Sequence, residues 1–262
     1  MNLIKNEKFS LGKHTFPFTI SPDYFQPNKT TELFVEAMTG RLKSPFLDMG
    51  AGLFPLSAWA LFENNDVKVY ASEKVPEQRE LGKQNIENLA SLYPCKNILK
   101  RFDSYCGSWF DSLPSPNVLT YATISGDLSG IANDIGRHMG WYNDNVPAGG
   151  LDGTEVIIPF LERVRPYLSE GGSVFFPIAI GFSDHEKIMD CAKKYFRKLE
   201  KRIGKINEKT KLRDDKKFII PPDKLPGLTD LKSTYTFLKN LKNQNSRTFW
   251  EGQIYEATDP II

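Results

Sequence analysis

The stretch Pro45–Leu56, PFLDMGAGLFPL, decides the fold of this chain. It opens with a short apolar strand that ends near Asp48 and passes into a Gly50-x-Gly52 turn. A strand, a tight glycine turn and a helix in this order are typical of nucleotide-binding α/β proteins. Pro55 stands where a dinucleotide-binding turn has its third glycine, and proline has no N–H to offer a pyrophosphate. The stretch therefore favours a nucleoside ligand without phosphates over a nicotinamide dinucleotide.

An acidic residue downstream supports this interpretation. Glu73 ends the next predicted strand, residues 67–73. Its distance from Asp48 is close to that at which Rossmann-type proteins carry the acid that binds the ribose hydroxyls. Proline at the first position of a helix is otherwise favourable. S-adenosylmethionine has a ribose diol and no phosphate, so it meets both conditions.

Strands and helices alternate outward from this stretch. The sequence predicts an α/β protein with a Rossmann-like, doubly wound, mostly parallel sheet and a terminal antiparallel strand or hairpin. We expect an N-terminal cap segment and helix over residues 1–45 and a catalytic domain over residues 46–262. The expected strands are 46–49, 67–73, 118–125, 173–180 and 247–258, and the expected helices lie at 28–40, 56–62, 76–93 and 154–172.

Composition limits the classes of partner. The 262 residues include 34 basic and 32 acidic ones, and a net charge of +2 gives little reason to expect a nucleic acid. The locally basic segment 191–217 has apolar residues at helical spacing, which favours a solvated amphipathic helix over an RNA or acidic-partner surface. Three scattered cysteines without Cys-x-x-Cys spacing indicate reduced thiols, and no run is apolar enough to span a membrane. We expect a cytoplasmic protein without a metal site.

Several motifs resemble those of one enzyme superfamily. FLDMGAGLFPLSAWALF, VYASEKVPEQRELGKQNIENL, FDSY and GGLDGTEVIIPFLERVRPYLSEGGSVFFPI are similar, in order and spacing, to motifs of class I S-adenosylmethionine-dependent methyltransferases. The small-domain branch that includes protein glutamine N5-methyltransferases is the most similar, and YFQPNKTTELFVEAM resembles the N-terminal segment of that branch. The resemblance spans roughly residues 16–181.

The resemblance implies a set of cofactor-binding residues. Asp48, Gly50 and Gly52 would lie against the methionine and ribose parts of S-adenosylmethionine. Glu73 would hold the ribose diol, and Asp103, in a segment that links two elements, would lie near the adenine amino group.

Two positions depart from the family pattern. Phe54 replaces a further glycine of the turn, and we expect it at the cofactor site, where it reshapes the methionine end. Residues 125–130, SGDLSG, stand where the amide-methylating branch has Asn-Pro-Pro-Tyr. The second departure argues against an amide substrate and for an amine or hydroxyl nucleophile.

The catalytic residues expected from this region are Asp127, Ser129 and Tyr142. Asp127 would act as base or orienter of the nucleophile, and Ser129 would be a hydrogen-bond partner. Tyr142, in the glycine-rich loop Met139–Gly153, would close over the sulfonium. The alternatives are that Asp127 caps the following helix and that a buried Trp141 merely anchors the loop.

Three functions are consistent with the sequence. The first is a methyltransferase that acts on a small metabolite or biosynthetic intermediate. The second is a cyclase, in which the amine of S-adenosylmethionine attacks its own γ-carbon to give azetidine-2-carboxylate and methylthioadenosine. The third is a non-catalytic S-adenosylmethionine-binding module. The sequence leaves the acceptor, the pathway and the oligomeric state open.

Overall fold

The computed structural model of the chain describes residues 4–141, 149–203 and 216–261. Two compact units make up the chain, and each is described by itself. The first comprises residues 1–127 and 163–175, and the second comprises 128–162 and 176–262. The residues described before position 45 belong to the same unit as the glycine turn.

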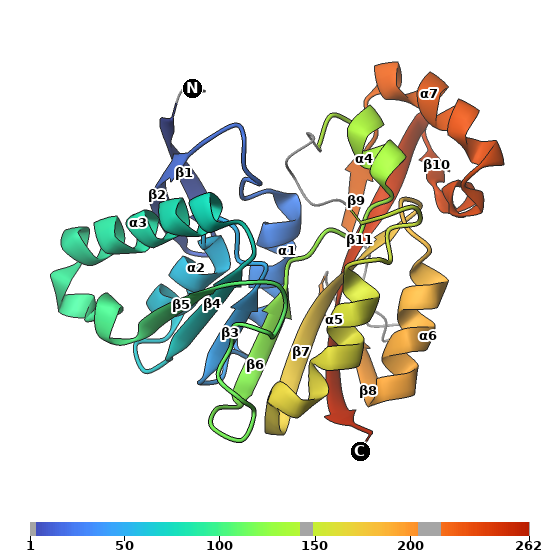
Figure 1. Cartoon of the computed structure of the whole chain (residues 1–262). Coiled ribbons are helices and arrows are strands. Elements are labelled where there is room, and N and C mark those ends of the chain that lie inside the picture. The colour runs from blue at the N-terminus through green and yellow to red at the C-terminus, as the bar shows by residue number, and fades with distance from the viewer. Residues whose placement is uncertain (1–3, 142–148, 204–215, 262) are drawn as a thin grey trace. The chain divides into compact units, whose positions relative to one another are not determined.

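The first unit is built on a parallel sheet (Figure 1). Its strand order is β7-β6-β3-β4-β5, so β3, which leads into the glycine turn, is central. Every residue of β3 and β4 is buried, as expected for parallel strands covered on both faces. The strands are β3 (Phe46–Met49), β4 (Val69–Glu73), β5 (Phe102–Cys106), β6 (Tyr121–Gly126) and β7 (Leu168–Ile180), of which the part up to Phe175 lies in this unit.

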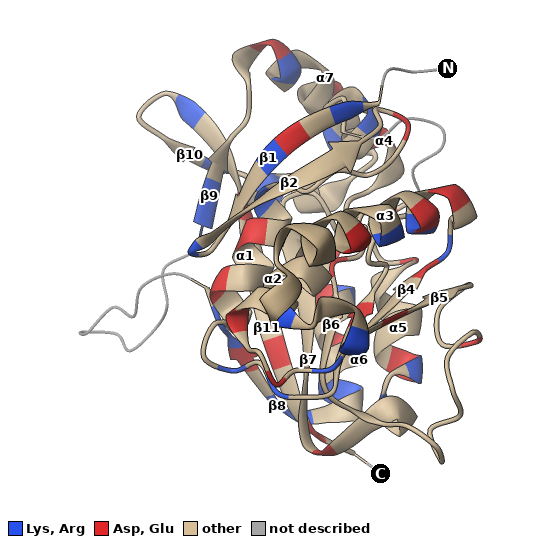
Figure 2. Ribbon diagram, turned by 90° about the vertical axis from the view of Figure 1, so that its left-hand side faces the viewer, with Lys and Arg blue, Asp and Glu red and all other residues tan. Residues whose placement is uncertain are grey.

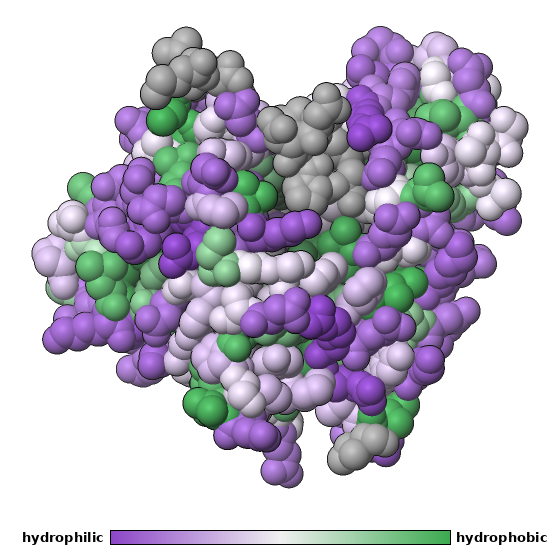
Figure 3. Space-filling view, in the orientation of Figure 1, coloured by the Kyte–Doolittle hydropathy of each residue, from purple (hydrophilic) through white to green (hydrophobic). Residues whose placement is uncertain are grey.

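Helices and a hairpin complete the first unit. Helix α1 begins after Asn28, whose side chain accepts the Thr30 N–H at 2.7 Å, and Gly40 follows its end at a φ of 74°. Helix α3 has a mixed-charge outer surface that is mostly hydrophilic (Figures 2 and 3). The elements are β1 (Lys5–Leu11), β2 (His14–Ile20), α1 (Lys29–Met38), α2 (Pro55–Glu63), α3 (Pro76–Leu92) and the 3-10 helices η1 (Pro94–Lys96), η2 (Ile98–Lys100) and η3 (Arg165–Tyr167).

The glycine turn depends on one close contact with α3. Phe54 has a φ of 67°, a left-handed conformation that is unusual for a bulky residue. Its ring is fully buried and lies 5.5 Å, centroid to centroid, from Phe102. A Cβ at Gly82 of α3 would lie only 2.9 Å from the Phe54 ring and 3.0 Å from the Gly52 carbonyl oxygen. Gly82 therefore lets the turn pack directly on the helix.

The second unit is organised by the long strand β11 (Arg247–Pro260). β10, β9 and β8 all pair antiparallel with it, and β7 is its other neighbour. A core of buried residues that includes Phe182 and Trp250 lies in this unit. The remaining elements are α4 (Asn133–His138), α5 (Ile157–Arg163), α6 (His185–Tyr195), β8 (Phe196–Lys201), β9 (Lys216–Ile219), η4 (Pro222–Lys224), α7 (Leu225–Asp230), η5 (Leu231–Ser233), η6 (Thr236–Asn240) and β10 (Lys242–Gln244).

The sheet class expected from the sequence is confirmed, and three local expectations are wrong. The helix expected within segment 191–217 ends at Tyr195, because residues 196–201 pair with β11 and this pairing overrides the helical spacing. The helix expected over 154–172 stops at Arg163, and β7 begins already at Leu168. Asp103 lies inside strand β5, not in a linking segment.

None of the helices formed by the described residues is both long enough and apolar enough to cross a lipid bilayer.

The close contact at Gly82 predicts that alanine is less favourable than glycine at this position of the helix. Alanine normally stabilises a helix interior relative to glycine by up to about 1 kcal/mol. Here we expect Gly82→Ala to lower the free energy of unfolding by about 1 to 3 kcal/mol, because the added methyl group overlaps the Phe54 ring and the Gly52 carbonyl.

Urea unfolding measures this change, and Gln84→Ala on the exposed side of α3 is the control. A Gly82→Ala protein as stable as the parent, or more stable, would contradict the close packing of turn and helix.

Candidate functional site

A pocket opens at the carboxyl ends of the central strands of the first unit. In open α/β sheets this edge is where ligands bind. The turn after β3, the end of β6 and the N-terminal segment before and within α1 all contribute to it. The lining residues are Phe25, Pro27, Thr31, Asp48, Gly50, Ala51, Gly52, Leu53, Pro55, Leu56 and Asp127.

The glycine turn is fixed by Glu73. Gly50 and Gly52 have φ values of 67° and 57°, which glycine adopts without strain. The Gly52 N–H donates to Glu73 Oε2 at 2.9 Å, and the Val75 N–H donates to Oε1 at 2.9 Å. Burial raises the pKa of Glu73, and these backbone N–H groups partly oppose the rise. Each oxygen keeps acceptor capacity for a further donor.

Asp48 supplies the cap that helix α2 lacks. Phe54, the N-cap residue, makes no side-chain capping bond. Asp48 Oδ2 instead accepts the Ser57 N–H at 3.0 Å and the Ser57 hydroxyl at 2.7 Å, and Oδ1 lies 3.3 Å from the Ser125 hydroxyl. A carboxylate at a helix N-terminus is stabilised by the helix dipole. Asp48 therefore fixes the start of α2 after the glycine turn, and it also lines the pocket.

Asp127 faces the same pocket from the end of β6. Its Oδ2 accepts the Thr31 hydroxyl at 2.8 Å. Burial raises the pKa of Asp127 to about 6, although the bond from Thr31 lowers it. Burial also raises the pKa of Asp48 to about 7, and the nearby Asp127 carboxyl adds to that rise. The pocket thus holds two carboxyl groups that titrate close to neutral pH.

Asp127 does not take the alternative role weighed from the sequence. Helix α4 starts after Ala132, which is its N-cap, and no side chain caps it. The partner of Asp127 is Thr31, 96 positions away in the sequence.

Two residues expected at the cofactor site do not line this pocket. Asp103 pairs in register with Tyr70 at the amino-terminal end of β5, whereas Cys106 is level with Glu73. Asp103 lies three residues before Cys106, which places it about 10 Å along the strand from the level of Glu73. The Phe54 side chain is buried between α3 and β5 and does not line the pocket. Phe54 therefore supports the turn through its packing against α3 and β5.

The remaining sequence candidates belong to the second unit. Ser129 is partly buried there, and Tyr142 lies outside the described residues. Trp141 is 39% exposed, and its ring centroid lies 5.6 Å from that of Phe182 and 5.7 Å from that of Trp250. The side chain is therefore exposed, not buried as the alternative required, although its ring packs against these two aromatic residues.

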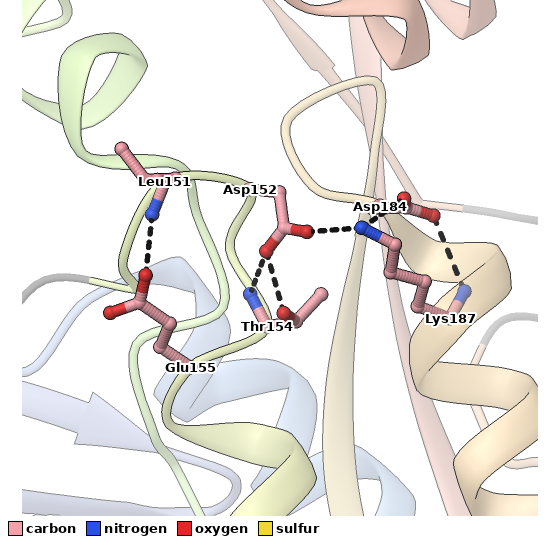
Figure 4. A network of polar contacts seen from close by, with 6 residues as sticks. All are labelled: Leu151, Asp152, Thr154, Glu155, Asp184 and Lys187. Atoms are coloured by element: carbon pink, nitrogen blue, oxygen red, sulfur yellow. Dashed lines mark hydrogen bonds and ion pairs between the residues drawn. The ribbon is translucent and has the colours of Figure 1, made fainter.

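The other end of that loop is fixed by an ion-pair network (Figure 4). Lys187 Nζ lies 2.7 Å from Asp152 Oδ2 and 3.2 Å from Asp184 Oδ2. The Thr154 hydroxyl donates to Asp152 Oδ1 at 2.6 Å. Burial would raise the pKa of Asp152, but the bonds from Lys187 and Thr154 outweigh it and lower the pKa. Asp152 and Asp184 thus accept backbone N–H groups, of Thr154 and Lys187. Asp127 differs from them, because the donor to its carboxyl group is the side chain of Thr31.

Sequence reasoning missed the N-terminal contribution to the pocket. Phe25 and Pro27 line it, and Thr31 reaches Asp127. The only sequence signal was the likeness of this segment to that of one methyltransferase branch, and nothing in the spacing singles out Thr31. Across the described ranges, no cluster of three or more His, Cys, Asp or Glu side chains is arranged to hold a metal.

No protein-family model and no curated protein matches the sequence. Solved structures do match. The tRNA m1G37 methyltransferase of M. jannaschii has a TM-score of 0.51 at 12% identity, over 98% of this chain and 55% of that one. The chain has a Rossmann-like fold.

Rossmann-like chains of about the same length are also similar. Precorrin-6y C5,15-methyltransferase from Geobacter metallireducens GS-15 has a TM-score of 0.48 at 12% identity, over 93% of this chain and 99% of that one. A methyltransferase from Pyrococcus furiosus has a TM-score of 0.48 at 14% identity, over 93% and 89%.

The raised pKa values predict that stability falls as pH rises. An unfolded aspartate titrates near pH 3.9, so between about pH 4 and pH 7 the folded protein binds more protons than the unfolded chain. Its free energy of unfolding should therefore decrease over this range. Asp127→Asn removes one of these groups and its effect on Asp48, so the decrease should be smaller in that variant.

Urea unfolding at about pH 5 and about pH 8 tests this. Between these values the parent should lose roughly 1 to 2 kcal/mol more than Asp127→Asn. The exposed Asp223→Asn is the control and should follow the parent. Equal losses in the parent and Asp127→Asn would show that Asp127 titrates at its ordinary value.

Proposed function

We propose that this protein is an S-adenosylmethionine-dependent methyltransferase that acts on an amine or hydroxyl of a small molecule. The observation that carries the proposal is the placement of Asp127 beside the glycine turn, in a pocket whose ionisable lining residues are carboxyl groups alone. The likeness to solved structures supports it, because the three described above are named methyltransferases.

The donor set fits this cofactor. Glu73 has spare acceptor capacity next to Gly52, which suits the two ribose hydroxyls. Asp48 and Asp127 suit the positive charge of an ammonium and a sulfonium. Pro55 begins α2 and removes a donor that a pyrophosphate would need. When bound, S-adenosylmethionine supplies an electrophilic methyl group.

The residues of the chain would bind, orient and remove a proton. Asp127 would accept the proton of the attacking amine or hydroxyl on Oδ1. A pKa of about 6 suits a base at neutral pH, since most of the carboxyl is ionised and still basic. The glycine turn and Glu73 would fix the position of the reacting groups, and orientation of this kind supplies much of the acceleration in group transfer.

A small acceptor is favoured over a nucleic acid by the pocket lining. None of the lining residues is lysine or arginine, and phosphates are usually held by such side chains. The cyclase is the second candidate, because two carboxyl groups in the pocket could equally hold and deprotonate the amine of the cofactor itself.

Product analysis separates the two functions. We expect S-adenosylhomocysteine to form only when an amine or hydroxyl acceptor is added from a panel of small metabolites. Methylthioadenosine formed from the cofactor alone would establish the cyclase and contradict methyl transfer. Neither product, together with measurable cofactor binding, would favour the non-catalytic module.

Asp127→Asn is the matched variant in the same assay. It keeps the shape of the side chain and loses the charge, so turnover should fall by about a hundredfold or more. Turnover within about threefold of the parent would exclude Asp127 as the base.

A further inference from the structure

Thr31 is a polar side chain at an unusual place. It lies in the first turn of α1, is fully buried and lines the pocket. Its hydroxyl oxygen accepts the Asn28 N–H at 3.4 Å, and the hydroxyl lies 2.8 Å from Asp127 Oδ2. One side chain thus joins the helix cap to the carboxyl group that the proposed function uses as a base.

These two contacts fix the direction of the hydrogen bond. A threonine hydroxyl has a single proton. Because an N–H already donates to its oxygen, that proton is free to point at Asp127. Thr31 therefore donates to Oδ2, and a donor of this kind favours the ionised form of a carboxyl group.

Asp127 also differs from its neighbour in how many of its oxygens are occupied. Both oxygens of Asp48 have hydroxyl or N–H partners from Ser57 and Ser125. Among the described residues, only the Thr31 hydroxyl bonds to Asp127, and it does so at Oδ2. Oδ1 is thus left to receive a proton in the pocket.

We propose that Thr31 is a positioning residue for the reaction: its hydroxyl holds Oδ2 of Asp127, so that the carboxylate stays ionised with Oδ1 presented to the acceptor. This inference rests on the proposed function, in which Asp127 is the base. It makes the N-terminal segment part of the catalytic machinery through α1.

The alternative is that Thr31 only docks α1. The helix has its cap from Asn28, and Thr39 at its other end bonds to the Val35 carbonyl of the same helix. Thr39→Val therefore removes the same hydroxyl from the same helix without touching the pocket, which makes it the matched control for Thr31→Val.

The pKa of Asp127 distinguishes a positioning role of Thr31 from a role in docking α1 alone. The titratable group that faces it is Asp48 of β3, and α1 contributes Thr31. The hydrogen bond from the Thr31 hydroxyl lowers the pKa of Asp127, and burial raises it. Loss of the hydroxyl removes the first effect and keeps the second, so the pKa of Asp127 should rise. A hydrogen bond to a charged group corresponds to a rise of about one to two pKa units. A purely docking role would not move it.

Carboxyl-carbon NMR of the full chain with 13C-labelled aspartate measures this without a substrate, and Asp127→Asn assigns the signal. We expect the midpoint to rise in Thr31→Val and to stay at the parent value in Thr31→Ser and Thr39→Val. In a parent sample labelled with 13C-threonine, the Thr31 Cβ shift should titrate with the midpoint of Asp127. An unchanged midpoint in folded Thr31→Val, or a Thr31 shift that does not follow Asp127, would overturn the inference.

Turnover gives the second readout once an acceptor is known. The acidic limb of the kcat/KM profile should move to higher pH in Thr31→Val and return to the parent position in Thr31→Ser. A uniform loss of activity at every pH would show a structural role only. If the parent transfers no methyl group, the proposed function fails, while the NMR titration still decides whether Thr31 controls Asp127.

Discussion

The buried carboxylate of Asp48 is the interaction on which the site depends. It sits at the end of the central strand β3 and binds Ser57 at the start of α2 and Ser125 near the end of β6. Three elements that are distant in the sequence are thereby held to one group. Because Phe54 offers no cap, α2 would start with unsatisfied N–H groups without Asp48. Asp48 thus fixes the start of α2 against β3 and β6, while Glu73 holds the glycine turn itself.

The same arrangement gathers buried acidic groups at an electrostatic cost. Asp48 and Asp127 line one pocket, Glu73 binds the turn beside it, and burial raises the pKa of each. Acidic groups held in this way cost stability at neutral pH, which proteins tolerate where the groups have a task. A ligand that carries positive charge and hydroxyl donors would relieve that cost. The acidity of the pocket and its proposed ligand are thus complementary.

The features of the site that could be predicted from the sequence are those formed by residues close together in the chain. The turn at Gly50 and Gly52, Pro55 at the start of its helix, and Glu73 at the end of the next strand all follow from short patterns with a fixed register. The N-cap at Asn28 is of the same kind. Such features depend on neighbouring residues, so a single sequence reveals them.

The rest could not be predicted because it depends on pairing between distant segments. The register of β5 on β4 pairs Asp103 with Tyr70 and Cys106 with Glu73, which composition does not encode. Residues 196–201 keep helical spacing yet join β11 as a strand. Thr31 meets Asp127 only because α1 packs beside the end of β6. In each case a tertiary contact outweighs the local preference.

In the proposed function, the edge of the sheet marked by Glu73 and the glycine turn binds S-adenosylmethionine. Calorimetry with S-adenosylhomocysteine tests it most directly, on the parent, Glu73→Ala and the exposed Glu80→Ala. The parent and Glu80→Ala should bind alike, and Glu73→Ala should bind about ten- to a hundredfold more weakly, since it loses charge-assisted hydrogen bonds. No binding by the parent, or an unchanged affinity in folded Glu73→Ala, would contradict the account.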